Sequence, residues 1–224
     1  NQLNEEGKKQ AKAFAEKLWA KIGEEIKEHP EQFVFLKSPL KRASDTAKAF
    51  EEKTLVEGGI KVSFTEDEGL REISFGSWEN LSEPEIRPEE QTRARSYREL
   101  NAFAKSEKGG QSFLEHLYAM YQTLKRLNDT YKGKTLVLVF HGTASSAMRV
   151  LMQDTAVFTP EGYIDWRKAM IPNAEIFHLV NRSEMRLLTM FSVDSSKPLF
   201  PQYRLKNFMR GGMDLIFRNP RKVK

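Results

Sequence analysis

The residue best placed for chemistry in this chain is a histidine that ends an apolar run. His141 follows residues 136–140 directly, and Gly142 and Thr143 come next at the apparent start of a helix. In open α/β sheets the ligand lies beyond the carboxyl ends of the strands, where helix N-termini present unpaired N–H groups to anions. Gly142 lets the backbone approach a ligand, and Thr143 can cap the helix. The pattern predicts that His141 contacts an anion.

Two further segments place an arginine and a carboxylate in similar positions. Arg42 lies in the stretch 38–47, which follows a second apolar run and opens a helix. Glu72 lies in the stretch 70–79, which fits no helical period and contains a glycine–tryptophan turn. An arginine fork matches phosphate oxygens, and a carboxylic acid can protonate a leaving alkoxide. With His141, these residues form a constellation suited to phosphate chemistry.

Five segments, in this order, resemble those of the histidine phosphatase superfamily, which includes the phosphoglycerate mutases. They are residues 3–11 (similar to L-T-x-x-G-x-x-Q-A), 38–47 (S-P-L-x-R-A-x-x-T-A), 70–79 (L-x-E-x-x-F-G-x-W-E), 110–112 (G-E-S) and 139–142 (V-S-H-G). Each segment alone is a weak signal, but five in the right order are a strong one. The resemblance spans most of the chain.

The resemblance implies a role for each candidate residue. Arg42 would bind the transferred phosphoryl group, His141 would stabilise charge on its oxygens, Gly142 would add to the phosphate site and Glu72 would donate the proton. The implied activity is hydrolysis of a phosphomonoester, either a small phosphorylated metabolite or a phosphoprotein, through a phosphohistidine, without a cofactor or metal ion. A mutase is disfavoured, because residues 80–84 do not resemble the longer patterned segment of the mutases.

The nucleophilic histidine that the resemblance implies is not found in its expected place. The family begins with a strand that ends in R-H-G, whereas this sequence begins at Asn1. The remaining histidines, at positions 29, 116 and 178, lie in a polar helix-ending stretch, an amphipathic helix and a strand. We expect all three to be surface or core residues, so none of them replaces the nucleophile.

A segment near the other end of the sequence suggests a circular permutation. Residues 213–217, followed by Arg218, Asn219 and Pro220, are similar to the missing first strand and motif. The termini of compact domains often lie close together, which would help such a rearrangement. The hypothesis requires that residues 213–217 lie parallel to and beside residues 135–140. The equally weighted alternative is an ordinary terminal strand, with the family's first strand absent from this sequence.

The two interpretations predict different chemistry. With Asn219 at the nucleophile position, an amide could not form the phosphoenzyme, and Pro220 would remove a backbone donor. The protein would then be a pseudophosphatase that binds phosphorylated ligands, with Arg218 joining Arg42 and His141 in a cationic cradle. Under the alternative, the complete protein is an ordinary phosphatase. Both interpretations predict that the pocket binds phosphate.

Length and composition predict one domain over residues 1–224. No apolar run approaches a membrane span and no signal sequence opens the chain, so we expect a cytoplasmic protein without membrane contact. The absence of cysteine excludes disulfides and thiolate metal sites. The net charge of +5 is spread over helices that also carry glutamate, so nucleic acid is not the expected partner.

The alternation of elements predicts an α/β fold, a three-layer α/β/α sandwich with a mostly parallel central sheet. Expected helices are 5–28 with Asn4 as its cap, 41–52, 111–131 and 144–152; expected strands are 33–37, 60–64, 135–140, 174–179 and 186–191, with a turn at 181–183. The charged stretch 80–108 breaks the pattern and is expected to be a variable, partly helical lid. Its basic run 93–98 is expected to recognise a negatively charged substrate.

Overall fold

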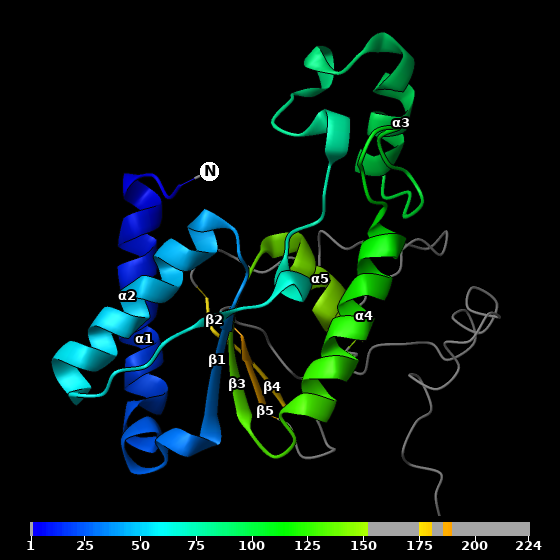
Figure 1. Cartoon of the computed structure of the whole chain (residues 1–224). Helices are drawn as coiled ribbons and strands as arrows, with labels where there is room; N and C mark the ends of the chain where they lie inside the picture. Colours follow the sequence, from blue (N-terminus) through cyan, green and yellow to red (C-terminus); the bar gives the residue numbers. More distant parts are fainter. Residues whose placement is uncertain (1, 152–174, 181–185, 190–224) are drawn as a thin grey trace, which may run out of the picture.

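A five-stranded sheet forms the centre of the protein. The computed structural model describes residues 2–151, 175–180 and 186–189. Within them the strand order is β2-β1-β3-β5-β4 (Figure 1). Four neighbouring strands run parallel, and β4 runs antiparallel to β5. The strands are β1 (Phe33–Lys37), β2 (Thr65–Glu66), β3 (Thr135–Val139), β4 (Phe177–Val180) and β5 (Arg186–Thr189). The predicted, mostly parallel sheet is confirmed.

Helices cover both faces of this sheet. They are α1 (Glu5–Glu28), α2 (Lys41–Gly58), α3 (Pro88–Arg98), α4 (Phe113–Thr130) and α5 (Gly142–Leu151), with short 3-10 turns η1 (Pro30–Gln32), η2 (Glu68–Leu70), η3 (Gly76–Trp78) and η4 (Glu83–Glu85). Figure 1 shows α1 and α2 on one face and α4 and α5 on the other. The predicted three-layer α/β/α architecture is confirmed.

The helices begin where local capping chemistry allows. The side chain of Asn4 accepts a hydrogen bond from the Gly7 N–H at 2.8 Å and starts α1 as predicted. At α4, the Ser112 hydroxyl accepts from the Glu115 N–H, while the Glu115 carboxylate accepts from the Ser112 N–H. This reciprocal capping box satisfies two amides that no helical carbonyl can reach.

The core on the α1–α2 side of the sheet is rich in aromatic rings. Phe50 of α2 is fully buried, with ring centroids of Phe14, Phe35 and Phe64 between 6.2 and 6.4 Å away. Tilted and edge-on ring pairs of this kind stabilise a core by about 0.5–1.5 kcal/mol each beyond the burial of their area. This packing fixes α2, and therefore the residues at its N-terminus, against the sheet.

One predicted strand is not a strand. Residues 60–64 have the alternating burial expected of a strand, with Val62 and Phe64 inward, but they pair with no neighbour in the described residues. The Phe64 N–H donates instead to the Glu51 carboxylate at 2.7 Å. Ladder pairing begins only at Thr65, opposite Leu36. A side chain of α2 therefore takes the place of a strand partner, which the sequence pattern does not reveal.

Both edges of β3 are paired, one with β1 and the other with β5. The position beside residues 135–140 that the permutation requires for residues 213–217 is therefore filled by β5 in this structure. Residues 213–220 and the predicted turn at 181–183 lie outside the described residues.

Residues 76–110, which we call the lobe, project beyond the end of the sheet (Figure 1). The lobe has a small core of its own, made by Trp78, Ile86 and Ala94. Its base is closed by backbone contacts, including the Phe75–Gly110 bridge and a 2.9 Å hydrogen bond from the Ser77 N–H to the Lys108 carbonyl. The predicted partly helical character of this region is confirmed by α3 and the turns before it.

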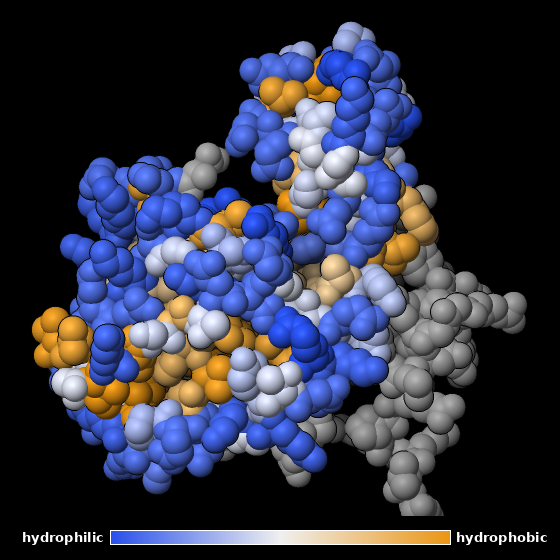
Figure 2. Space-filling model, viewed as in Figure 1, coloured by the Kyte–Doolittle hydropathy of each residue, from blue (hydrophilic) through white to orange (hydrophobic). Residues whose placement is uncertain are grey.

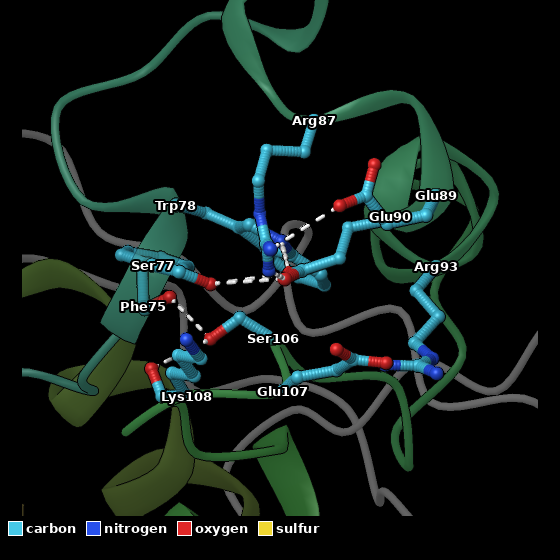
Figure 3. Close-up of polar contacts among 10 residues, drawn as sticks. All are labelled: Phe75, Ser77, Trp78, Arg87, Glu89, Glu90, Arg93, Ser106, Glu107 and Lys108. Carbon is cyan, nitrogen blue, oxygen red and sulfur yellow. Dashed lines mark hydrogen bonds and ion pairs between the residues drawn. The ribbon is translucent and has the colours of Figure 1, made fainter.

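A buried carboxylate organises the inside of the lobe. Figure 3 shows Arg87, Ser77 and Trp78 directed at Glu90, which accepts hydrogen bonds from all three side chains. Burial acts to raise the pKa of Glu90, but these hydrogen bonds outweigh it and hold the pKa below the ordinary value. Glu90 therefore stays ionised and joins α3 to the Gly76–Trp78 turn.

Replacing Gly76 with alanine should loosen the base of the lobe. Gly76 has φ +55°, and an added Cβ would lie 2.1 Å from the Lys108 carbonyl oxygen. Gly59 is the matched control, because it has φ +66° but no atom within 4 Å of an added Cβ. Gly59→Ala should lower the free energy of unfolding by about 1–2 kcal/mol, and Gly76→Ala by clearly more. Equal losses in urea unfolding would contradict the close packing of the base.

Candidate active site

The parallel register of β1 and β3 brings two polar side chains to the same sheet edge. Lys37 lies opposite Val139, and the Ser38 N–H donates to the Val139 carbonyl at 2.8 Å. Just beyond this point, the Ser38 hydroxyl lies 2.7 Å from His141 Nε2. Both side chains are buried. The carboxyl ends of the two strands thus form the floor of a polar site.

Arg42 reaches the same histidine from the first turn of α2. Its Nε–H donates to His141 Nδ1 at 3.1 Å. Within the part of the chain that the structure describes, the two Nη groups of Arg42 have no hydrogen-bond partner, and the guanidinium forms no ion pair. The structure therefore brings the predicted Arg42 and His141 together and leaves a planar pair of donors available to a ligand.

The two hydrogen bonds define the tautomer of His141. Because Arg42 donates to Nδ1, the proton of the neutral ring is on Nε2, and Nε2–H donates to the Ser38 hydroxyl. Burial lowers the pKa of His141 to about 3, and the charges of Arg42 and His116 act in the same direction. The ring is therefore neutral at neutral pH. In this state it cannot take a proton from Ser38, which argues against Ser38 as a nucleophile.

Glu72 lies at the N-terminus of α5. Its carboxylate accepts hydrogen bonds from the Thr143 N–H at 3.2 Å and the Ala144 N–H at 3.1 Å. The prediction that Thr143 caps this helix is wrong: α5 begins one residue earlier, at Gly142, and Thr143 donates its N–H to Glu72. A carboxylate from a segment remote in sequence satisfies these amides better than a hydroxyl, because it also complements the helix dipole.

The surroundings of Glu72 act on its pKa in opposite directions. Burial raises the pKa above its ordinary value, whereas the hydrogen bonds from Ile73, Thr143 and Ala144 and the charge of Arg42 lower it. Burial is the largest influence, and the pKa is raised on balance. A carboxyl group with a raised pKa retains a proton that it can give to a leaving group.

The other predicted site residues have different outcomes. Gly142 is the first residue of α5, and its carbonyl accepts from the hydroxyls of Ser145 and Ser146. Arg218 and Asn219 lie outside the described residues.

The basic run of the lobe is paired within the lobe. Arg93 forms an ion pair with Glu107 at 2.8 Å, and Arg95 and Arg98 both pair with Glu83. The arginines that were expected to recognise a negatively charged substrate therefore form ion pairs with carboxylates of the lobe instead.

Two residues of the site were not singled out from the sequence. Ser38 opens the 38–47 stretch, and only the pairing of β1 with β3 reveals that it orients His141. His116 of α4 is buried as a core histidine, and its Nε2 has no hydrogen-bond partner among the residues that the structure describes. Burial lowers the pKa of His116 to about 4. Its helical spacing predicted burial but gave no sign of its closeness to His141.

Among the described residues, no group of three or more histidine, aspartate or glutamate side chains is arranged to hold a metal ion. None of the helices in this described part of the chain has the length and apolar character needed to cross a bilayer.

With this geometry in place, comparison with known proteins identifies the family. A family model for the histidine phosphatase superfamily (branch 1) matches residues 1–188 of the 224. The chain belongs to this superfamily. The resemblance seen in the five sequence segments is thereby confirmed. No curated protein matches the chain.

Three solved structures share the fold of this chain, and two of them are described as phosphatases. Bacillus stearothermophilus YhfR has a TM-score of 0.60 at 21% identity, with 87% of this chain and 83% of that chain covered. A mycobacterial glucosyl-3-phosphoglycerate phosphatase complexed with inorganic phosphate has a TM-score of 0.58 at 22% identity, with 88% of each chain covered. An Entamoeba histolytica phosphoserine phosphatase in complex with 3-phosphoglyceric acid has a TM-score of 0.58 at 22% identity, covering 86% and 85%.

Replacing His116 with leucine should flatten the acid side of the stability profile. Burial lowers the pKa of His116 from 6.5 to about 4, so on acidification the unfolded chain binds the proton before the folded chain does. Wild-type stability is therefore lost as the pH falls through this interval. His116→Leu should reduce the slope of unfolding free energy against pH by up to about 1.4 kcal/mol per pH unit.

Urea unfolding at a series of pH values across the interval measures the two slopes. His29→Gln, at an exposed position, is the control for replacing a histidine. Parallel curves for wild type and His116→Leu would show that His116 is not held neutral by burial.

Proposed function

We propose that the pocket formed by Arg42, His141 and Glu72 binds the phosphoryl group of a phosphomonoester and that the protein hydrolyses such esters. The observation that carries the proposal is the 3.1 Å hydrogen bond from Arg42 to His141, which leaves the Nη donors of Arg42 without a partner in the described residues. A planar pair of N–H donors binds two oxygens of a phosphate at once.

Each residue has a distinct part in the proposed reaction. Arg42 binds two phosphoryl oxygens, and the neutral His141, held by Ser38, lies against the same group. Glu72 donates a proton to the oxygen of the departing alcohol, for which its raised pKa suits it. The family resemblance implies a histidine nucleophile, and we assign this role to none of the described residues. The phosphatases with the same fold support a small phosphorylated metabolite as the substrate.

The second candidate function is a pseudophosphatase that binds a phosphorylated ligand without hydrolysing it. Its support is in the sequence alone: Asn219 and Pro220 stand where a circularly permuted chain would carry the nucleophilic histidine and its glycine. Against it, β5 fills the position beside β3 that the permutation requires. An asparagine amide cannot form the phosphoenzyme. The two functions share phosphate binding and differ in turnover, so a binding measurement and a hydrolysis assay together distinguish them.

Arg42→Ala should abolish the stabilisation of the protein by inorganic phosphate. A ligand that binds only the folded state raises the melting temperature by an amount that grows with the logarithm of its affinity, and Arg42 supplies the main charge for this ligand. Arg126→Ala is the control, because it also removes an arginine, but one on α4 that is paired with Asp67. Thermal unfolding with and without phosphate measures the effect. A full phosphate shift in Arg42→Ala would contradict the assigned pocket.

Glu72→Gln should slow hydrolysis most for esters with poor leaving groups. An alkyl alcohol needs a proton as it departs, so its kcat/KM should fall by about 10²–10⁴-fold, whereas p-nitrophenyl phosphate should be much less affected. In the wild type, the alkyl phosphate rate should decline as pH rises through the raised pKa of Glu72, because the protonated form is the donor.

Glu68→Gln, at an exposed position in η2, is the matched control. Equal losses for both esters in Glu72→Gln would exclude Glu72 as the proton donor. Phosphate binding by the wild type without hydrolysis of either ester would favour the pseudophosphatase.

A further inference from the structure

The side chain of Ser38 is held in one position beside His141. The Ser38 N–H donates to the Val139 carbonyl at 2.8 Å, and the following Pro39 restricts the Ser38 backbone to extended conformations. The Leu40 N–H donates to the Ser38 hydroxyl oxygen at 3.3 Å, as in the local turns that serine forms with the backbone two residues on. The residue is also fully buried. Backbone, side-chain rotamer and surroundings therefore all restrain this hydroxyl.

The hydrogen bonds around Ser38 leave its own proton without an acceptor. Because Arg42 donates to Nδ1 of His141, the Nε2–H of the ring donates to the Ser38 oxygen at 2.7 Å. Together with the Leu40 N–H, this bond uses both lone pairs of the hydroxyl oxygen. Among the described residues, no group accepts the O–H proton. A buried donor without an acceptor destabilises a folded protein, so stability alone does not explain a serine at this position.

The same hydroxyl determines how Arg42 is held. A neutral imidazole has one N–H and one acceptor nitrogen, and Ser38 places an acceptor at Nε2. With the proton on Nε2, the Nδ1 atom accepts the hydrogen bond from Arg42. With the proton on Nδ1, two N–H groups would face each other and this bond would be lost. Ser38 therefore favours the tautomer of His141 that fixes Arg42 Nε, from which the two Nη donors project. The His141 site lies at the carboxyl end of the sheet, away from the exposed apolar surface near the end of α2 in Figure 2.

We propose that Ser38 is a positioning residue of the phosphoryl pocket: it holds His141 as the Nε2–H tautomer, and His141 in turn orients the guanidinium of Arg42 toward the phosphate. The inference rests on the proposed function, because it assigns the phosphate to Arg42. Ser38 is fully buried, so it acts through the imidazole and not by contact with the ligand. The hold matters because a bidentate hydrogen bond needs both N–H groups aligned with two phosphate oxygens. The effect falls on the phosphoryl group, whereas that of Glu72 falls on the leaving group.

Isothermal titration calorimetry of the full chain with inorganic phosphate tests the proposal. Ser38→Ala should weaken phosphate binding by about tenfold, because the buried Nε2–H loses its acceptor and one tautomer is no longer favoured. Ser38→Cys is close to serine in size, but its sulfur is a weak acceptor, so it should weaken binding even if Ser38→Ala does not fold. Ser106→Ala is the matched control and should keep the wild-type affinity, because it removes a buried hydroxyl that donates to the Phe75 carbonyl instead.

Three further measurements separate positioning from a general loss of structure. In a His141→Ala background, Ser38→Ala should cause no additional loss of phosphate affinity, because its effect passes through the imidazole. In the Ser38→Ala variant alone, nitrogen-15 NMR should show His141 as a mixture of the two neutral tautomers. In turnover, kcat/KM should fall by the same factor for an alkyl phosphate and for p-nitrophenyl phosphate, unlike in Glu72→Gln.

The outcomes separate this inference from the proposed function. Phosphate binding that depends on Arg42 but is unchanged in Ser38→Ala and Ser38→Cys would overturn the positioning role alone. A single Nε2–H tautomer in Ser38→Ala, or a further loss of affinity in the His141→Ala background, would also overturn it. Absence of phosphate binding by the wild type would overturn the proposed function, and the positioning role with it.

Discussion

The site depends on the parallel register between β1 and β3. Because Lys37 lies opposite Val139, the next residues of both strands leave the sheet at the same level, and Ser38 meets His141 there. Arg42 then reaches the other ring nitrogen from the first turn of α2. A shift of one residue in this register would turn each side chain to the opposite face of the sheet and separate all three groups. The tightly packed aromatic core under α2 and the fully buried β3 therefore keep the His141 ring in place between Ser38 and Arg42.

Glu72 connects this edge to the rest of the molecule. Its carboxylate occupies the N-terminus of α5, so the helix dipole and two amides fix its position. The chain continues from Glu72 to Phe75 and into the lobe, whose base is held by Gly76 and whose interior is held by Glu90. Glu72 and the base of the lobe are thus supported by one continuous segment.

Local sequence patterns predicted most of the fold, because apolar periodicity and caps such as Asn4 act over a few residues. They also predicted Arg42 and His141 as partners, since both follow strands of one parallel sheet. Three features depended on contacts between distant segments and were missed: the role of Ser38, the capping of α5 by Glu72, and the loss of strand pairing at 60–64 to the Glu51 side chain. The basic run of the lobe suggested a substrate site, but a run of charges does not reveal which carboxylates fold against it.

The protonation state of His141 is the most direct measure of whether Arg42, Ser38 and His141 form the pocket described above. Nitrogen-15 NMR of the imidazole rings distinguishes the two neutral tautomers from the charged form. We predict a neutral ring with its proton on Nε2 near neutral pH, and a change in the Nδ1 resonance when phosphate binds the Nη groups of Arg42, while exposed His29 keeps its signals. A charged ring, a proton on Nδ1, or no response to saturating phosphate would contradict the phosphoryl pocket described here.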